Sequence, residues 1–265
     1  MSEWNSREER QADARAEYER IMTTPSPDPM GAFIESGVIG FVFGEMWRRG
    51  VLTARDRRLI TLSCVGAAGA TTPIETHVWA ALNSGDLTYA EFDEFVLHFA
   101  TQLGWPKASD LNLHGMMSAF RLAEEREEEL EAHDFELWVG PVDDEVRRER
   151  GEAAYRSIQD EPSPSAPTAF RGRSYLDFLY GEIWTRDQHL TRRDRRIVSI
   201  CCAGAAGVDE EVSEHLRAAL SMEELTYEEL QELVVHYAVY LGWPLGRRLD
   251  DLLIAEAGET GEDAR

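Results

Sequence analysis

Four histidines occupy matching positions in two stretches of this chain, and they are the side chains best suited to acid–base chemistry. His215 follows His77 by 138 residues, and His236 follows His98 by the same interval. Because an imidazole exchanges a proton near neutral pH, we predict that His77 and His215 are catalytic. His98 and His236 are candidates for substrate contact. The alternative for each is a partly buried histidine that hydrogen-bonds a backbone carbonyl.

Two arginine-rich segments could bind an anion. Asp56 and Asp194 each lie in an Arg-Asp-Arg-Arg or Arg-Arg-Asp-Arg-Arg stretch, where Arg57 and Arg195 directly follow the aspartate. A guanidinium can hold a carboxylate through two parallel hydrogen bonds. We therefore predict an anionic substrate site that includes these arginines and aspartates. The alternative is a charged first helical turn, in which the helix dipole stabilises the aspartate.

Metal and thiol chemistry are disfavoured. The chain has no His-x-Glu, Cys-x-x-Cys or His-Glu-x-x-His sequence, so no metal site is predicted. Cys64 and Cys202 lie in Ala/Gly-rich stretches, where a small buried side chain is the usual role of cysteine. We expect the adjacent pair Cys201-Cys202 to have no redox role.

The histidines belong to a duplication that runs through most of the chain. Leu103-Gly104-Trp105-Pro106 returns as Leu241-Gly242-Trp243-Pro244 at the interval of 138, and Gly44-Glu45 returns as Gly181-Glu182 at 137. A period this long indicates a duplicated domain rather than a short solenoid repeat. We predict a first repeat, a linker and a second repeat at residues 1–132, 133–143 and 144–265.

Helical patterns dominate, and the predicted fold class is all-α. A charged helix is predicted over Arg7–Met22, and a second over about Phe33–Arg48. Thr53 is the expected N-cap of a third helix, and Thr71 or Thr72 that of a fourth.

Two later helices carry a stronger start signal. Thr88-x-x-Glu91 and Thr226-x-x-Glu229 are capping-box sequences. Gly104-Trp105-Pro106 is predicted to end the first of these helices, and another helix is expected from about Ala108.

Composition limits the partners. The 265 residues carry a formal charge of −23, which argues against nucleic acid and against an anionic membrane surface. The N-terminal segment lacks the apolar core of a signal peptide, and no run approaches the roughly 20 apolar residues of a membrane span. We expect a cytoplasmic protein.

Over about residues 40–120 and 175–255 the chain resembles the carboxymuconolactone decarboxylase family. The resemblance is carried in both repeats by Gly-Glu-x-Trp, Asp-Arg-x-Leu/Ile-x-Thr/Ser, His-x-x-x-Ala-Leu, Leu-Thr-Tyr-x-Glu and His-x-Ala-x-x-x-Gly-Trp-Pro. It implies two small helical bundles that behave as a fused dimer. It also implies a homo-oligomer, here a trimer or dimer of two-repeat chains.

Two activities recur in the family that the chain resembles. One is cofactor-free decarboxylation in aromatic catabolism, and the other is the thiol–disulfide chemistry of an alkylhydroperoxidase branch. In that branch a glutamate and two cysteines precede the histidine. Their positions here hold Arg58, Ala70 and Pro73 in the first repeat, and Arg196, Val208 and Glu211 in the second. Peroxidase activity is therefore disfavoured.

The decarboxylase branch resembles the chain more closely. Glu211 lies one helical turn before His215 and gives the branch's Glu-x-x-x-His spacing, which Pro73 breaks in the first repeat. The helix end Ala81-Leu82-Asn83-Ser84-Gly85 is kept only in the first repeat. We therefore expect the repeats either to share one hybrid site or to keep one working site.

The implied reaction is loss of CO₂ from a small anionic lactone or related carboxylate. Electrons move toward the lactone carbonyl, so the protein must stabilise an oxyanion and deliver a proton to carbon. Arg57 or Arg195 would hold a carboxylate. His77 or His215 would supply the proton with a pKa near the working range, and Glu211 would orient His215. The substrate is its own electron sink, so no cofactor is expected. The alternative is a relative whose pocket serves another role or no reaction.

Overall fold

Every regular element that the structure describes is a helix, as the sequence predicted. The computed structural model describes residues 6–129 and 143–260. The helices of the first repeat are α1 (Arg7–Met22), η1 (Phe33–Met46), α2 (Ala54–Ala68), α3 (Thr71–Asn83), α4 (Tyr89–Leu103) and α5 (Trp105–Arg126). Those of the second are α6 (Asp144–Gln159), η2 (Phe170–Ile183), α7 (Arg192–Ala206), α8 (Asp209–Ser221), α9 (Tyr227–Leu241) and α10 (Trp243–Thr260).

Local capping fixes where the central helices begin. At α2 the Thr53 hydroxyl accepts a hydrogen bond from the Asp56 amide at 3.1 Å, and the Asp56 carboxylate accepts one from the Thr53 amide at 3.0 Å. The same reciprocal bonds, which satisfy otherwise unpaired N–H groups, start α7, α4 and α9. The capping boxes predicted from Thr88 and Thr226 are confirmed.

Two other helix starts differ from the prediction. The N-cap of α3 is Ala70, which has no side-chain cap, and Thr71 and Thr72 lie inside the helix. Gly104 ends α4 at φ 92°, but Trp105 already belongs to α5 because Pro106 needs no hydrogen-bonded N–H in a first turn. The helix expected from about Ala108 therefore begins three residues earlier.

The second helix of each repeat is wound more widely than an α-helix. In η1 and η2 the bonds run from residue i to i−5, as in the 3.0 Å bond from the Trp47 amide to the Val42 carbonyl. The Trp184 amide donates to the Leu179 carbonyl in the same way, also at 3.0 Å. Such helices are rare beyond one turn. Each places its C-terminal tryptophan against a histidine of the other repeat.

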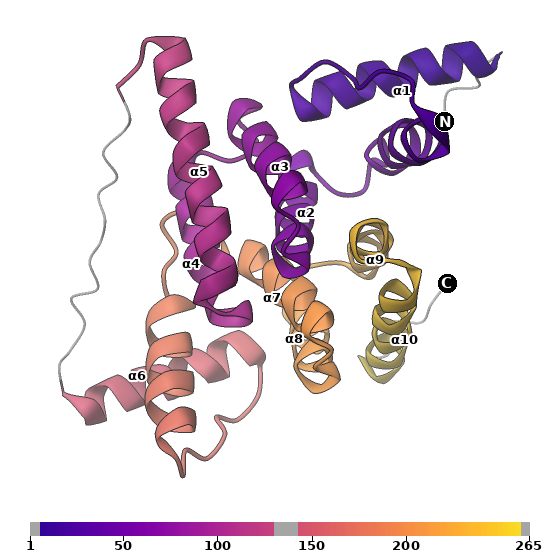
Figure 1. Ribbon diagram of the computed structural model, residues 1–265. Coiled ribbons are helices and arrows are strands. Elements are labelled where there is room, and N and C mark those ends of the chain that lie inside the picture. The colour runs from indigo at the N-terminus through magenta and orange to yellow at the C-terminus, as the bar shows by residue number, and fades with distance from the viewer. Residues whose placement is uncertain (1–5, 130–142, 261–265) are drawn as a thin grey trace.

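The two repeats exchange helices rather than packing as separate bundles. Helix α2 packs on α7 and on α9, and α4 packs on α7. One hydrophobic core consequently includes residues of both repeats, among them Leu59, Phe95, Ile197 and Leu233. Figure 1 shows α1 at one end of the molecule and α6 toward the opposite end. The repeated histidines lie between these ends, where helices of the two repeats meet.

Reciprocal ion pairs across the repeats indicate an internal two-fold relation. Arg55 binds Asp194 at 3.2 Å, and the equivalent Arg193 binds Asp56. Reciprocal contact of equivalent residues is what a two-fold interface requires. The duplicated chain thus reproduces within itself the geometry of a symmetric dimer.

Two further expectations concern the ends and connections of the repeats. The predicted linker 133–143 lies, except for Asp143, outside the described residues, and Asp143 is the N-cap of α6. Among the helices described, none is long and apolar enough to cross a bilayer.

Candidate functional site

The four repeated histidines lie at two equivalent places, and each place combines side chains of both repeats. We call them site 1 and site 2. Site 1 consists of Trp47, Arg57, Arg58, Thr61 and His77 with Glu232, His236 and Tyr240 of α9. Site 2 consists of Gln159, Tyr180, Trp184, Arg195, Arg196, Ser199 and His215 with Glu94 and His98 of α4. All four histidines are buried. From the sequence we expected one hybrid site or one working site; the structure brings residues of both repeats together at two places, and whether either is a working site stays a prediction.

His236 and His98 join the repeats. Nε2 of His236 is 2.9 Å from the Thr61 hydroxyl, and its Nδ1 accepts from Arg57 at 3.2 Å. Nε2 of His98 is 3.0 Å from the Ser199 hydroxyl. Burial, assisted by the nearby arginines, lowers the pKa of both rings well below its ordinary value. They are neutral imidazoles whose contacts lie within the protein.

Arg57 and Arg195 form buried ion pairs with glutamates of the other repeat. Arg57 donates to Glu232 at 2.8 Å, and Arg195 donates to Glu94 at 2.7 Å. Glu232 also accepts from Arg49 at 2.7 Å. Burial of unpaired charge is costly, so these pairs must be intact for the helices to meet. The predicted carboxylate-binding guanidiniums therefore already hold carboxylates of the chain itself.

Asp56 and Asp194 are helix-capping residues that also pair across the repeats. Each closes the capping box of its own helix and binds an arginine of the other repeat. Both are buried. These contacts explain why both repeats have an aspartate here: each aspartate is a charged residue of the first turn of its helix.

His77 and Arg58 form the part of site 1 with unused hydrogen-bonding capacity. Arg58 is fully buried, and it binds Asp86 through Nε at 2.9 Å and the Ile21 carbonyl through Nη2. Its Nη1 has no partner, nor has Nδ1 of His77. Buried polar groups without partners are rare enough to need an explanation.

The surroundings of His77 keep its ring neutral. Burial, with a smaller effect from the Arg58 guanidinium, lowers its pKa to about 3. The expected value near the working range is therefore wrong for this ring. The Tyr240 ring lies 5.4 Å from His77 between centroids, and the Tyr240 hydroxyl accepts from Trp47 at 2.9 Å. Burial also raises the pKa of Tyr240 to about 12, so the phenol keeps its proton.

In site 2 the equivalent arginine and histidine are satisfied by the protein. Arg196 donates from Nη1 to Nδ1 of His215 at 2.8 Å and to Oε1 of Gln159 at 2.7 Å. The Gln159 amide then donates to the Tyr180 hydroxyl at 2.7 Å. Burial and Arg196 lower the pKa of His215 well below its usual range. The unpaired nitrogens in this site are instead Nδ1 of His98, Nη1 of Arg195 and Nε1 of Trp184.

Glu211 lies on α8 with an exposed side chain, and partial desolvation of its carboxylate, with a further effect from Glu210, raises its pKa. Nδ1 of His215 contacts Arg196 and Gln159, so the contacts described for this ring do not include Glu211. Its predicted orienting role stays a prediction.

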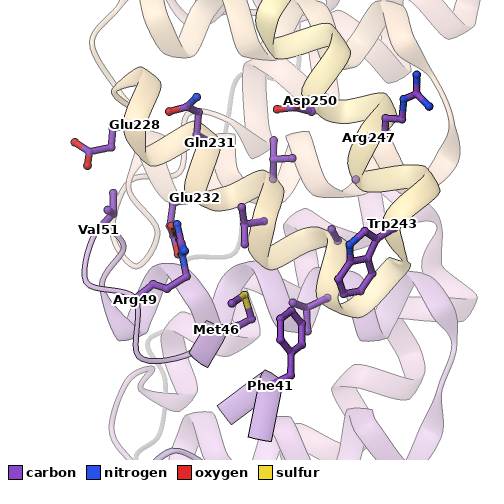
Figure 2. Close-up of a pocket in the computed structure, with 15 residues that line it drawn as sticks. Phe41, Met46, Arg49, Val51, Glu228, Gln231, Glu232, Trp243, Arg247 and Asp250 are labelled. Carbon is purple, nitrogen blue, oxygen red and sulfur yellow. Dashed lines mark hydrogen bonds and ion pairs between the residues drawn. The ribbon is translucent and has the colours of Figure 1, made fainter. Parts of the chain in front are cut away.

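Three clefts open near these helices. Figure 2 shows one of about 590 Å³ between η1 and the α9–α10 pair, with Arg49 and Glu232 in its wall and Phe41 beside Trp243. A second, of about 420 Å³, includes Ile21, Trp47 and Arg57 in its wall. A third, of about 350 Å³, lies beside Trp79. None of these three walls includes a repeated histidine, but Ile21 and Trp47 of the second cleft both contact Arg58.

The thiols are poorly placed for chemistry. Cys64, Cys201 and Cys202 are free and buried. Burial raises the pKa of Cys201 and Cys202 well above the ordinary value, which suppresses the reactive thiolate. Within the described residues there is also no group of three or more histidine, cysteine or acidic side chains that could bind a metal.

Sequence reasoning missed Arg58, Tyr240 and Gln159 as site residues. Arg58 and Arg196 stood out only as replacements for the glutamate of the thiol-dependent branch. Their spacing of 19 residues before His77 and His215 was the available signal. Tyr240 and Gln159 are not repeated, so the search for matched positions passed over them.

Comparison with known proteins agrees with this architecture. Residues 35–112 and 172–252 each match the sequence profile of the "Carboxymuconolactone decarboxylase family". A "4-carboxymuconolactone decarboxylase" from Acinetobacter baylyi is 39% identical over 67 residues, which are 25% of this chain and 48% of that protein. The match thus spans about half the length of this curated relative. Because the two profile matches together cover more than half of the sequence, the chain belongs to the carboxymuconolactone decarboxylase family.

Proposed function

We propose that the protein is a cofactor-independent lyase that decarboxylates a small anionic lactone or related carboxylate at the repeat interface. The observation that carries the proposal is the buried pair of Arg58 and His77, each with an unused hydrogen-bonding nitrogen. Such a pair has the chemistry needed to bind a carboxylate or an enolate oxygen. Family membership and the partial match to a carboxymuconolactone decarboxylase support the reaction class.

No group is transferred to the protein in this reaction. Catalysis therefore depends on stabilising the negative charge that moves onto the carbonyl oxygen. The bond between the carboxylate and the lactone ring breaks, CO₂ leaves, and the electron pair moves through the conjugated system to the carbonyl oxygen. Arg58 would stabilise the developing oxyanion from a dry environment, where a fixed cation is more effective than in water. Arg57 and Arg195 are proposed to position this region through their ion pairs.

Protonation at carbon completes the reaction. His77 is neutral in the free protein, so it is proposed first to donate a hydrogen bond as an imidazole, without delivering a proton from an imidazolium. Binding of an anion beside it would raise its pKa and allow it to take a proton and pass it on. Tyr240, which is protonated and adjacent, is the other proton donor in site 1.

The direct test is turnover of 4-carboxymuconolactone by the purified full chain. Release of CO₂ and appearance of the decarboxylated enol-lactone are followed together by NMR. We expect turnover in the wild type and a loss of at least about 100-fold in Arg58→Met, because removal of one preorganised oxyanion donor has an effect of that order. Absence of turnover in the wild type would exclude the named reaction and leave the family assignment intact.

A second candidate function is a family member whose pocket has been taken over by another role. The observation that favours it is the asymmetry of the two sites, because Gln159 occupies the hydrogen bonds of Arg196 in site 2. A homo-oligomer in which the exposed apolar side chains of α5, such as Met117 and Phe120, meet a second copy is compatible with either function. Light scattering of the purified chain distinguishes a dimer or trimer from a monomer.

A further inference from the structure

The two sites differ at the residue that follows the isoleucine whose carbonyl binds the arginine. Arg58 donates to the carbonyl of Ile21, as Arg196 donates to that of Ile158. Met22 follows Ile21 in the first repeat, and Gln159 follows Ile158 at the equivalent position of the second. Gln159 accepts from Arg196 at 2.7 Å, whereas the Met22 thioether offers only a weak acceptor. Nη1 of Arg196 is satisfied both by Gln159 and by Nδ1 of His215 at 2.8 Å, whereas Nη1 of Arg58 binds neither Met22 nor His77.

A neighbouring position adds to the difference. Tyr180, which receives the Gln159 amide proton, is replaced in the first repeat by Phe43. Phe43 and Met22 pack with Trp47 and Ala80, so the side of site 1 beside the unpaired nitrogens is apolar. Site 1 therefore offers two hydrogen-bonding groups against an apolar wall, which is the usual composition of a small-molecule site.

Access to the two sites also differs. The first turn of α7 carries Arg192, which reaches α6 and donates to the Ser157 carbonyl at 2.9 Å. The equivalent residue of α2 is Ala54, which lies in the wall of the 420 Å³ cleft. An arginine therefore bridges the two helices in the second repeat, and a methyl group leaves the corresponding space open in the first.

The open cleft is basic although the chain is strongly acidic. Its wall contains four arginines and one acidic residue, in a protein of formal charge −23: Arg20, Arg48, Arg49, Arg57 and Glu17. Asp13 pairs with Arg48, Glu232 with both Arg49 and Arg57, and Glu17 with Arg20, so four arginines face three carboxylates and the local excess is about one positive charge. A cleft of this sign concentrates small anions. Ile21 and Trp47 lie in the wall of this cleft, and both contact Arg58.

We propose that site 1 is the single open carboxylate site of the chain, that its ligand is a small carboxylate with an apolar body, and that Gln159 and Arg192 keep site 2 closed. The carboxylate enters through the basic cleft and accepts hydrogen bonds from Nη1 of Arg58 and from the neutral His77 ring. Its apolar body lies against Met22 and Phe43. This inference rests on the proposed function for its substrate class, but its test measures binding alone.

The unpaired nitrogens of site 2 do not provide an equivalent opening. Nη1 of Arg195 and Nδ1 of His98 lie beside the Arg195–Glu94 pair, whereas the equivalent Arg57 and His236 bind each other at 3.2 Å. The walls of the three clefts described include neither Arg195 nor His98, although Arg57 lines the basic cleft. The distinction lies in Met22 against Gln159 and in Ala54 against Arg192.

The test is the number of binding sites for benzoate, measured by isothermal titration calorimetry on the full chain, with benzamide as the uncharged control. We expect one benzoate per wild-type chain and no comparable binding of benzamide. Met22→Gln copies the closing residue of site 2 into site 1, and it should weaken benzoate binding at least about tenfold. The double variant Gln159→Met with Arg192→Ala is the matched control, and it should bind two benzoates per chain.

Several results would overturn the inference. These are no benzoate binding by the wild type, two sites in the wild type, or unchanged binding in Met22→Gln with native circular dichroism. If Met22→Gln fails to fold, the gain of a second site in the double variant still decides the question. Turnover assays separate this inference from the proposed function. One benzoate site without CO₂ release leaves the inference standing, and CO₂ release without a benzoate site leaves only the proposed function.

Discussion

Site 1 and site 2 share their supporting residues and differ in the residues that would face a ligand. Both have an arginine–glutamate pair across the repeats, a histidine bound to a helix α2 or α7 hydroxyl, and a tryptophan against that histidine. Nη1 of Arg58 and Nδ1 of His77 are unpaired in site 1, whereas the equivalent nitrogens of Arg196 and His215 bind each other and Gln159. The comparison indicates that the interface constrains one set of residues and leaves the other free to diverge.

The largest expected effect concerns the buried arginine–glutamate pairs that both sites share. Glu232→Ala leaves Arg57 buried without its partner, and Glu94→Ala does the same to Arg195. Breaking a buried pair from one side costs about 3–5 kcal/mol. We expect both variants to lose stability by that amount, measured by urea unfolding at neutral pH.

A matched control is Arg156→Ala, which removes an exposed pair with Glu152 and should change stability by less than about 1 kcal/mol. If only one glutamate variant is destabilised, the two sites do not share a common support.

The next largest effect concerns His77 and His215, whose surroundings differ between the two sites. We expect His77→Asn to lower turnover of 4-carboxymuconolactone by about 100-fold, the lower end of what a general acid–base group contributes. His215→Asn should retain turnover within about threefold, because Gln159 and Arg196 already occupy that ring. Steady-state kinetics on both variants measure the difference. Equal losses would show that the repeats share one functional unit.

A pH experiment sharpens the comparison on the same ring. His77 has a pKa of about 3 when folded, against 6.5 when unfolded, so the unfolded chain binds more protons between these values. Stability from this group is therefore complete above pH 6.5 and is lost as the pH falls toward 3, by at most about 1.4 kcal/mol per pH unit.

His77→Gln cannot take up this proton. Between pH 6 and roughly 4 the unfolding free energy of the variant should therefore fall less steeply with pH than that of the wild type. The difference in slope corresponds to at most about one proton taken up on unfolding. Urea unfolding at a series of pH values measures the slope for each protein. Parallel slopes would mean that His77 is not buried as a neutral ring.

Much of the fold follows from local signals in the sequence, and much of the site does not. Thr53, Thr88 and Thr226 start helices because a cap needs only residues three apart. The duplication identified the matched residues, but from it we expected one hybrid site or one working site, whereas the structure has two equivalent places. The exchange of α4 and α9 between repeats depends on contacts more than a hundred residues apart, which no local pattern encodes.

The histidine chemistry was predicted only in part, for a related reason. Spacing identified His77 and His215, but their neutral state results from burial and from Arg58 and Arg196 on other helices. From the sequence, Arg57 was predicted to bind an anionic substrate. Its partner in the structure is Glu232 of the other repeat, and no local sequence pattern indicates that pairing. The residues that separate the sites, Met22 and Gln159, differ between repeats. A search for matched positions could not find them.

The smallest expected effect returns to the shared scaffold. Thr53→Ala and Thr191→Ala each remove the hydroxyl of a capping box, at the start of α2 and of α7. Loss of such a cap costs about 1 kcal/mol. The two helices face each other, and each capping aspartate also binds an arginine of the other repeat. We therefore expect similar losses in urea unfolding, with the double variant departing from the sum because the sites are coupled. Strict additivity would indicate that the reciprocal ion pairs hold the aspartates in place without help from the threonines.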